Sequence, residues 1–318
     1  MTQKIIIAVD HGNSKIKTPN YSFPSSYKES GHLPTLGADV VHFIGKEYVL
    51  TNRRMPQKND KTEDDSNFIL TLFAIGKELT GTVHSLSWLP PGEPIEIILL
   101  VGLPPLHCKG LGEKFRHYFT SRRDVVRFDF NHLPIAIRIA DVCVYPQAYA
   151  AAIVAQDKFQ AAQTVNIVDI GGYTIDLLQL TNFKPDMSVC TSIYGGVNIL
   201  FQEINDQARA KGNKDISDAT IEGVLMNNPK VLLDCSSART DLIRASATQF
   251  TRNMLLDISQ RGVDLQEDRT VFVGGGSILL CDCIEKTGLV ARPIFVDNIH
   301  ANAQGYQLLY ENRKGAKT

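Results

Sequence analysis

The stretch NIVDIGGYTIDLLQL, residues 166–180, joins two apolar runs through a turn that contains two glycines. The runs are rich in Ile, Val and Leu, which predicts a buried strand before the turn and another after it. Gly171-Gly172 suits a tight turn, but a plain hairpin requires neither a carboxylate at Asp169 nor the pair Tyr173-Thr174. We therefore expect a negatively charged ligand to bind at this turn.

A related pattern lies near the N-terminus. VDHG at residues 9–12 and VDIG at residues 168–171 share the form V-D-x-G, and each closes a predicted strand. Asp10 and Asp169 are 159 positions apart, which is half of the 318-residue length. Each half then continues roughly as strand, strand, strand, helix, strand, helix, strand, helix. The sequence therefore predicts a duplicated α/β domain rather than a short-period repeat.

The expected elements follow from hydrophobic periodicity and turn residues. In the first half we expect strands over 4–10 and 15–18, a hairpin over 40–50 that turns at Gly45-Lys46, a buried strand over 94–103 and a strand pair around Asn131-His132; helices are expected over 66–81, over 109–121 and from Pro146. In the second half we expect strands over 164–170, 174–180, 187–194, 270–273 and 291–296, and helices near 197–211, 217–226, 237–260, 277–286 and 299–311.

Composition indicates an ordinary globular protein with no strong charge preference. The chain is 43% hydrophobic and 21% charged, with a formal net charge of −1. No global basic field favours direct binding to nucleic acid. The apolar run after Lys4 is too short for a secretory leader, and no run approaches the ~18 apolar residues that span a bilayer. We expect a cytoplasmic protein that binds neither DNA directly nor a membrane.

The two turns can bind phosphate through their backbone amides. A tight glycine turn aims successive N–H groups at one point and forms a nest for anions. If the two halves face each other, both nests contact one phosphate chain; the residues concerned are Gly12, Asn13 and Ser14 in the first turn, and Gly171, Gly172, Tyr173 and Thr174 in the second. Asp10 and Asp169 would then lie close together, and Mg²⁺ between them would remove their repulsion. Lys17 can reach the phosphates as a point charge.

Two further segments are candidates for the same site. VFVGGGSILL, residues 271–280, places three glycines between a strand and a helix, where a ligand or simply a tight turn would require them. The chain contains neither a G-x-x-x-x-G-K-[ST] nor a G-x-G-x-x-G match. In VYPQAYAAAIVA, residues 144–155, Pro146 suits a first helical turn and places Gln147 beside the end of a strand. A Gln there can orient a water for attack on a terminal phosphate, although a surface Gln is the simpler explanation.

Taken in order, these motifs resemble those of the actin-fold ATPases, and among them the plasmid-type actin-like proteins of the ParM group. The resemblance covers almost the whole chain and rests on DHGNSKIK at 10–17, VGLPP at 101–105, DIGGYTID at 169–176, VGGGS at 273–277 and NIHANAQGYQLLY at 298–310. It implies two ribonuclease-H-like α/β domains with a nucleotide cleft between them. Domain I would cover 1–157 with a small insertion at about 20–90, domain II 158–298, and a C-terminal helix at 299–318 would return to domain I.

The resemblance also implies roles for individual residues. Asp10 and Asp169 would hold Mg²⁺, largely through water, and Lys17 would contact the phosphates of ATP or ADP. Gln147 would position the attacking water, with Asp169 also catalytic, and Gly274, Gly275 and Gly276 would lie against the nucleoside. The plasmid-type actin-like proteins carry Glu at the position of Gln147. Actin itself has Gln there, as this chain does. The preference for an adenine nucleotide over a guanine nucleotide is implied by the family resemblance alone.

Several functions share this ATPase core. The resemblance favours a filament-forming ATP hydrolase that moves plasmid DNA through a separate DNA-binding adaptor protein, with a second copy of the chain as its main partner. A small-molecule kinase and an ATP-binding scaffold of the pilus-assembly type remain alternatives. The polar segment TNRRMPQKNDKTEDDS, residues 51–66, is either a solvated loop or part of a filament interface.

Overall fold

A computed structural model describes residues 4–30, 37–51, 60–82, 93–122 and 124–315. The chain separates into two compact units. Unit 1 comprises Met1–Val154 together with His300–Thr318, and unit 2 comprises Ala155–Ile299. Residues 52–59 of the polar segment lie outside the described residues, so its assignment as an interface stays a prediction.

Among the described residues, unit 1 contains a nine-stranded sheet in the order β3-β2-β1-β7-β9-β8-β5-β6-β4. Its strands are β1 (Ile5–His11), β2 (Lys15–Lys17), β3 (Ser22–Pro24), β4 (Tyr27–Ser30), β5 (Val40–Phe43), β6 (Lys46–Leu50), β7 (Ile95–Leu103), β8 (Val126–Phe130) and β9 (Leu133–Pro146). β1, β7 and β9 run parallel, whereas β2 pairs with β1 as an antiparallel hairpin. The carboxyl ends of the three parallel strands therefore meet at one edge of the sheet.

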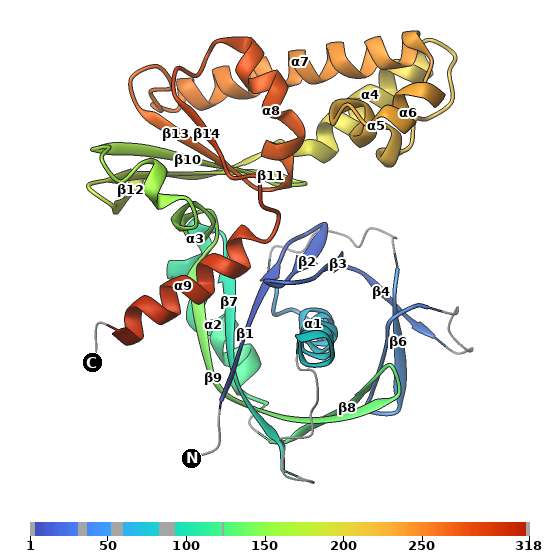
Figure 1. Cartoon of the computed structure of the whole chain (residues 1–318), viewed down its shortest axis with the longest axis vertical. Coiled ribbons are helices and arrows are strands. Elements are labelled where there is room, and N and C mark those ends of the chain that lie inside the picture. Colours follow the sequence, from blue (N-terminus) through green and yellow to red (C-terminus); the bar gives the residue numbers. More distant parts are fainter. Residues whose placement is uncertain (1–3, 31–36, 52–59, 83–92, 123, 316–318) are drawn as a thin grey trace. The chain divides into compact units, whose positions relative to one another are not determined.

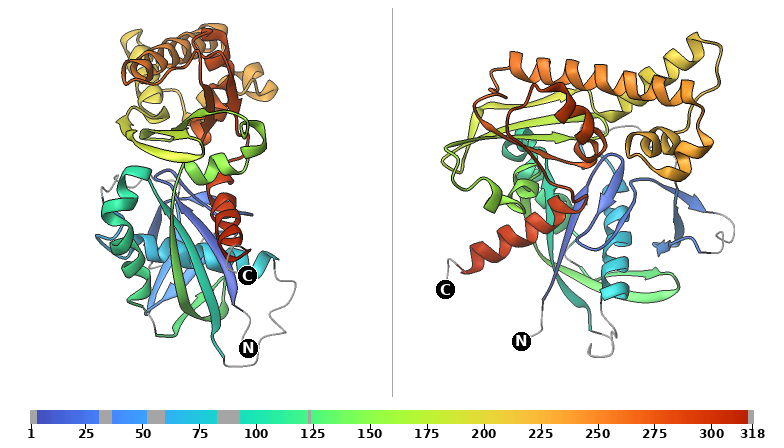
Figure 2. Two further views of the ribbon diagram at one scale, coloured as in Figure 1. Left: turned by 90° about the vertical axis from the view of Figure 1, so that its left-hand side faces the viewer. Right: turned by 45° about the horizontal axis from the view of Figure 1, so that its top comes forward.

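The two faces of these central strands form separate cores. Odd-numbered residues such as Ile7 and Val9 belong to a large apolar core, and even-numbered residues such as Ala8 belong to a smaller one. Helices α1 (Ser66–Thr82) and α2 (Pro105–Thr120) fill the large core. Helices α3 (Tyr149–Ile153) and α9 (Ala301–Gly315) cover the other face. Figure 2 (left) shows α2 and α9 on opposite sides of the sheet. Burial on both faces explains why 95–103 reads as a continuous apolar run.

The sheet of unit 1 curves around α1. Figure 1 shows α1 enclosed by strands from β1 round to β6, and α1 contacts β1, β2, β5 and β8. Helix α1 begins at Ser66, as expected, but Gly81 lies inside the helix and does not end it. A Cβ atom on Gly81 would lie 1.5 Å from the Tyr21 hydroxyl, so the glycine allows close packing rather than a stop.

Unit 2 is built on a five-stranded sheet, counted over the described residues, in the order β12-β11-β10-β13-β14. Its strands are β10 (Thr164–Ile170), β11 (Thr174–Thr181), β12 (Lys184–Tyr194), β13 (Arg269–Val273) and β14 (Pro293–Phe295). One face packs against a helical layer that contains α4 (Val197–Ala210), α5 (Asp218–Leu225), α6 (Pro229–Asp234), α7 (Ser237–Gln260) and α8 (Gly275–Thr287). Helix α7 contacts α4, α5 and α8 within this layer.

The strand orders confirm the predicted duplication. In unit 1, β3-β2-β1 is an antiparallel meander and β7 and β9 follow in parallel; in unit 2, β12-β11-β10 and then β13 and β14 repeat this arrangement. By this correspondence β1 is equivalent to β10, so Asp10 and Asp169 occupy equivalent strand positions. The fold is α/β with two ribonuclease-H-like units.

The expectation of a helix from Pro146 is wrong. Pro146 is the last residue of β9 and pairs with Leu103 of β7. The backbone N–H of Gln147 also donates to Leu103 O, at 2.8 Å, so the chain is still held to the sheet there. Ala148 has φ +58°, which no helix can accommodate, and α3 begins only at Tyr149.

Smaller differences have local causes. The strand expected over 187–194 begins earlier, at Lys184, because the turn before it has only two residues, Asn182-Phe183, both at positive φ. Short β3, β4 and α6 were not predicted, because runs of three to six residues give too little periodicity.

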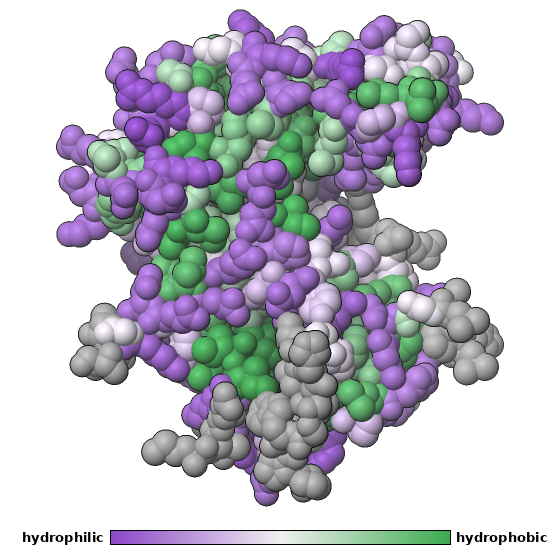
Figure 3. Space-filling view, viewed as in Figure 1, coloured by the Kyte–Doolittle hydropathy of each residue, from purple (hydrophilic) through white to green (hydrophobic). Residues whose placement is uncertain are grey.

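The described surface is mainly polar. Figure 3 shows hydrophilic side chains over most of the visible face, with smaller apolar patches between them. The most exposed large apolar side chains include Leu233 and Ile44, at 86% and 79% exposure. Among the described helices, none combines the length and hydropathy that crossing a membrane requires.

Candidate functional site

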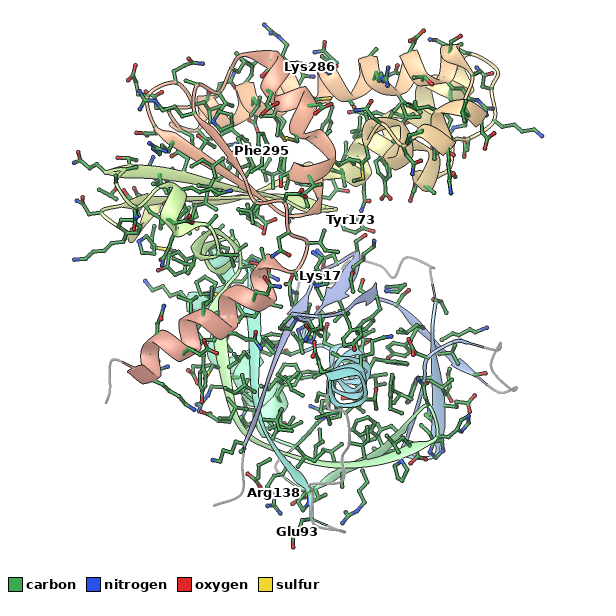
Figure 4. The ribbon with its side chains drawn as sticks, viewed as in Figure 1. Lys17, Glu93, Arg138, Tyr173, Lys286 and Phe295 are labelled. Atoms are coloured by element: carbon green, nitrogen blue, oxygen red, sulfur yellow. The ribbon has the colours of Figure 1, made fainter. Side chains whose placement is uncertain are left out.

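Asp10, near the end of β1, is a buried carboxylate with several partners in unit 1. Only 2% of the residue is exposed. Lys17, labelled in Figure 4, lies directly across the β1–β2 ladder, with its Nζ 3.8 Å from Asp10 Oδ2. Gln147 Nε2 donates to Asp10 Oδ1 at 2.6 Å. The structure therefore brings three predicted site residues together around one acidic strand end.

Two further donors to Asp10 come from the C-terminal helix α9. Asn302 Nδ2 lies 3.5 Å from Asp10 Oδ2, and the Tyr306 hydroxyl lies 3.4 Å from Asp10 Oδ1. Tyr306 is fully buried and its hydroxyl occupies the space that a Cβ on Gly102 would need. Sequence reasoning identified α9 as a closing helix but missed these roles. The available signal was a polar Asn302 on the apolar face of the helix.

The turn after β1 has a fixed backbone. A Cβ on Gly12 would lie 2.6 Å from Lys15 O, so the turn requires a glycine there. Ser25 binds two carbonyl groups of this turn: its hydroxyl donates to Asn13 O at 2.6 Å, and its amide donates to Ser14 O at 3.2 Å. In a trans peptide the C=O of one residue and the N–H of the next point in opposite directions. The amides of Ser14 and Lys15 therefore point away from Ser25.

His11 and Lys61 support this turn from behind. Lys61 Nζ donates to His11 O at 2.6 Å. The His11 ring is buried against Phe115 and Phe119, and its Nε2 lies 2.8 Å from the Thr71 hydroxyl. Burial and then the charge of Lys61 lower the pKa of His11 from 6.5 to about 3, so the ring is neutral at neutral pH. Neither residue was a sequence candidate, because their contacts join distant segments.

In unit 2, Asp169 ends β10 beside Gly274. The ladder places Asp169 directly opposite Asp176 of β11, where unit 1 places Lys17 opposite Asp10. Gly274 has φ +87°, and a Cβ there would lie 2.2 Å from Asp169 Oδ1. Thr174 Oγ1 donates to Asp176 Oδ2 at 3.4 Å. The second acidic strand end therefore has a carboxyl group across the ladder where the first has a lysine.

The β10–β11 turn presents a row of amides. The amides at the start of α4 bind its carbonyl groups: Gly196 N donates to Tyr173 O, Val197 N to Gly171 O and Asn198 N to Gly172 O, at 2.9–3.1 Å. Three successive carbonyls thus point towards α4, so the N–H groups of Gly172, Tyr173 and Thr174 point away from it. Tyr173, labelled in Figure 4, lies in the middle of this row.

One member of the expected nest is not a donor to a ligand. The Gly171 amide already donates to Thr174 O, at 2.9 Å, and closes the turn. Gly171 instead contributes its lack of a side chain, since its Cβ would lie 3.1 Å from Thr174 O. Gly196, which sequence reasoning missed, allows α4 to approach, because a Cβ there would lie 2.5 Å from Gly171 O. The YGGV pattern at 194–197 was the available signal.

The three glycines after β13 differ in what they contact. A Cβ on Gly276 would lie 2.7 Å from Ile170 O, and Gly274 faces Asp169 as described, so both permit close packing of α8 on the end of β10. A Cβ on Gly275 would meet nothing within 4 Å. The tight strand-to-helix turn therefore accounts for Gly274 and Gly276, and a role of the three glycines at a nucleoside stays a prediction.

The residues of both units suit a magnesium nucleotide. Carboxylate oxygens are the protein ligands that Mg²⁺ uses, together with water and phosphate oxygens. Within the described part of the chain, no three His, Cys, Asp or Glu side chains form a metal-binding group. Asp10 and Asp169 are the residues that would hold such an ion in the two units. Rows of backbone amides beside Asp10 and Asp169 fit the phosphate part of such a ligand.

Comparison with known proteins gives the fold independently. No family model and no curated protein matches this sequence. Among solved structures, Ta0583, an archaeal actin homologue, is similar with a TM-score of 0.76 and 15% identity, over 97% of this chain and 99% of that one. The subunit of a 15-stranded ParM filament from Clostridium botulinum is similar with a TM-score of 0.70 and 16% identity, over 98% and 99%. The Alp12 filament structure has a TM-score of 0.67 and 18% identity, over 98% and 100%.

These likenesses extend over almost the whole length of each chain, as expected if both units belong to one shared fold. The chain therefore has the actin-like fold of the archaeal actin homologue and of the ParM and Alp12 filament subunits.

Proposed function

We propose that this chain is an ATPase that assembles head to tail into filaments with Mg-ATP and disassembles after hydrolysis. The observation that carries the proposal is the repeated arrangement of an acidic strand end beside a glycine turn, at Asp10 in unit 1 and at Asp169 in unit 2. The actin-like fold supports it. One solved neighbour, at a TM-score of 0.70 and 14% identity, is a complex of the archaeal actin homologue with ADP, and two others are filaments.

The proposed site assigns a task to each group. The amide rows beside Gly12 and Gly172 bind phosphate oxygens of ATP or ADP, and Lys17 adds a positive charge. Asp10 and Asp169 hold Mg²⁺ largely through water. When bound, this ion neutralises charge that develops on the phosphates. Gly274, Gly275 and Gly276 lie against the nucleoside.

Gln147 orients the attacking water in this proposal. The residue is 8% exposed and its side chain donates to Asp10 at 2.6 Å, so it already lies beside a proposed magnesium ligand. A neutral amide can donate to and accept from a water molecule, which fixes the direction of attack without removing a proton. Asp169, at the equivalent strand end, is the second group that we assign to catalysis.

Nucleotide state would control assembly through the angle between the two units. A heterologous contact whose rotation does not close produces an open filament of identical subunits. We propose plasmid DNA as the cargo, attached through a separate DNA-binding adaptor, because a net charge of −1 does not favour direct contact with DNA. Adenine specificity is part of the proposal, so GTP belongs in the tests.

Sedimentation and light scattering with Mg-ATP, Mg-GTP, Mg-ADP and no nucleotide test the proposal. We expect pelleting with Mg-ATP and its reversal as ADP accumulates. A monomer that phosphorylates a metabolite would instead indicate a small-molecule kinase. A protein that binds ATP without turnover or pelleting, and that recruits another protein, would indicate a scaffold of the pilus-assembly type.

The variant Gln147→Ala separates hydrolysis from assembly. We expect phosphate release to slow by about 100-fold while Mg-ATP polymers persist longer, because the water loses its orientation but the nucleotide stays bound. Phosphate release at the wild-type rate, or rapid disassembly in Mg-ATP, would contradict the role of Gln147.

A further inference from the structure

The backbone beside Gln147 makes an unusual turn. Ala148 has φ +58° and ψ −58°, and the Tyr149 amide donates to Gln147 O at 2.5 Å. A hydrogen bond between residues i and i+2 around such a centre is the strained form of the γ-turn, whose centre lies at about φ +75° and ψ −65°. A residue with a Cβ rarely adopts this conformation. The turn therefore needs support from its surroundings.

Ala148 is fully buried, so solvent cannot supply that support. Three backbone groups of Gln147 and Ala148 are each bound by a different element. The Gln147 amide is bound by Leu103 O of β7, and Ala148 O accepts from Ala152 N of α3. The Ala148 amide donates to the side chain of Asn302, at Oδ1 and 3.0 Å. Asn302 lies on α9, 154 positions away, and is 91% buried.

Asn302 contacts both the turn and the acidic residue that Gln147 faces. Its Oδ1 binds the Ala148 amide while its Nδ2 lies 3.5 Å from Asp10 Oδ2. Gln147 Nε2 donates to Asp10 Oδ1. The Asn302 side chain thus links the strained backbone at Ala148 to Asp10, the carboxylate that Gln147 also binds.

Strain of this kind is found where the surrounding structure holds a functional group in place. In an ordinary helix start after Pro146, Ala148 would have a negative φ and the bond from the Tyr149 amide to Gln147 O would be absent. We propose that Asn302 is a positioning residue: it clamps the γ-turn at Ala148 and thereby holds Gln147 against Asp10. This inference rests on the proposed function, in which Gln147 orients the attacking water.

Steady-state kinetics of Asn302→Ala test the clamp. We expect kcat for ATP hydrolysis to fall about tenfold while the affinity for Mg-ATP changes less than about twofold, because the short bond of Asn302 is to the Ala148 amide, whereas its contact with the proposed magnesium ligand Asp10 is long, at 3.5 Å. Gln304→Ala is the matched control, since it removes a side-chain bond from the same helix, to Pro19 O, away from the turn. We expect this control to keep the wild-type kcat.

A second substitution distinguishes the clamp from general support of the fold. Glycine accepts positive φ without steric cost, so Ala148→Gly should reduce the need for the clamp. In that background we expect Asn302→Ala to lower kcat by less than about threefold. An equal loss in both backgrounds, or wild-type kcat in Asn302→Ala alone, would overturn the proposal.

A measurement without nucleotide separates this inference from the proposed function. Hydrogen exchange followed by NMR in the ligand-free protein should show the Ala148 amide and the Gln147 side-chain amide exchanging at least about tenfold faster in Asn302→Ala than in Gln304→Ala. Unchanged exchange at both groups would refute the clamp. If the wild-type protein proves unable to bind ATP, the proposed function fails, and this exchange experiment still decides whether the clamp exists.

Discussion

A neutral histidine lies behind the first turn of unit 1. His11 is 1% exposed and follows Asp10 directly. The Thr71 hydroxyl donates to Asn67 O at 2.7 Å, so towards His11 it can only accept, and the ring must carry its proton on Nε2. Lys61 is the charged group whose position most opposes protonation of the ring. A second proton on this ring would place an uncompensated charge in an aromatic pocket.

We expect this ring to make stability depend on pH. The folded pKa of His11 is lowered to about 3 from 6.5, so between these values the unfolded chain binds a proton that the folded chain excludes. The free energy of unfolding therefore falls as pH falls from about 6.5, by up to about 1.4 kcal/mol per pH unit from this group.

Urea unfolding of wild type and His11→Gln at about pH 7 and pH 5 measures this effect. The free energy of unfolding should change more between the two pH values in wild type than in His11→Gln, since Gln does not titrate. Asp60, whose pKa is lowered to about 2, titrates below this window and does not interfere. Equal pH dependence in both proteins would show that His11 is not buried in neutral form.

The glycines at Gly274 and Gly275 offer a matched pair at the second strand end. Gly274→Ala should lower the stability of unit 2 by about 2 kcal/mol or more, because it combines a strained φ with a clash against Asp169. Gly275→Ala should change it by less than about 0.5 kcal/mol, since the space beside it is open. Thermal unfolding of both variants checks this; equal midpoints would contradict the packing of α8 on β10.

At the scale of elements, α9 owes its position to one close approach. A Cβ on Gly305 would lie 1.9 Å from Ala150 O of α3, so the two helices touch backbone to backbone. The contact places Asn302 and Tyr306 of α9 beside Asp10. Helix α9 thus contributes to the first acidic site although it comes last in the sequence.

Two glycine-to-alanine variants in helices should have opposite effects. Gly305→Ala should lower stability by about 2 kcal/mol or more, because backbone atoms of α3 cannot move aside cheaply. Gly110→Ala in α2 should raise it by up to about 1 kcal/mol, since nothing lies near that position and alanine favours helix. The midpoints of thermal unfolding of both variants test this prediction. A higher midpoint for Gly305→Ala than for wild type would contradict the close contact between α9 and α3.

The sequence predicted most elements because their signals are local. Apolar runs located β7 and β10, and turn residues located the hairpins at Asn131-His132 and Gly45. The start of α3 could not be predicted, because the conformation of Ala148 depends on a bond from Asn302, far along the chain. The two acidic turns were found from a local motif, whereas Lys61 and Tyr306 reach the site only through tertiary packing.

At the scale of the whole molecule, one architecture occurs twice in the chain. Asp10 and Asp169 are the second-last residues of the equivalent strands β1 and β10, yet their partners across the hairpin differ. Lys17 lies opposite the first carboxyl group, and a second carboxyl group, Asp176, lies opposite the other. Like charges directly opposite in a ladder are unfavourable. A bound cation would relieve such repulsion at unit 2, so the two copies of the motif differ in the charge that they can accept from a ligand.

Equilibrium binding of Mg-ATP to wild type, Asp10→Ala and Asp169→Ala tests the central claim most directly, because the two substitutions lie in different units. We expect each to weaken binding of Mg-ATP by about 100-fold or more, and to abolish the difference in affinity between ATP with and without Mg²⁺. Circular dichroism would confirm that both variants are folded. Wild-type affinity in either variant would contradict the claim that both acidic strand ends hold one magnesium nucleotide.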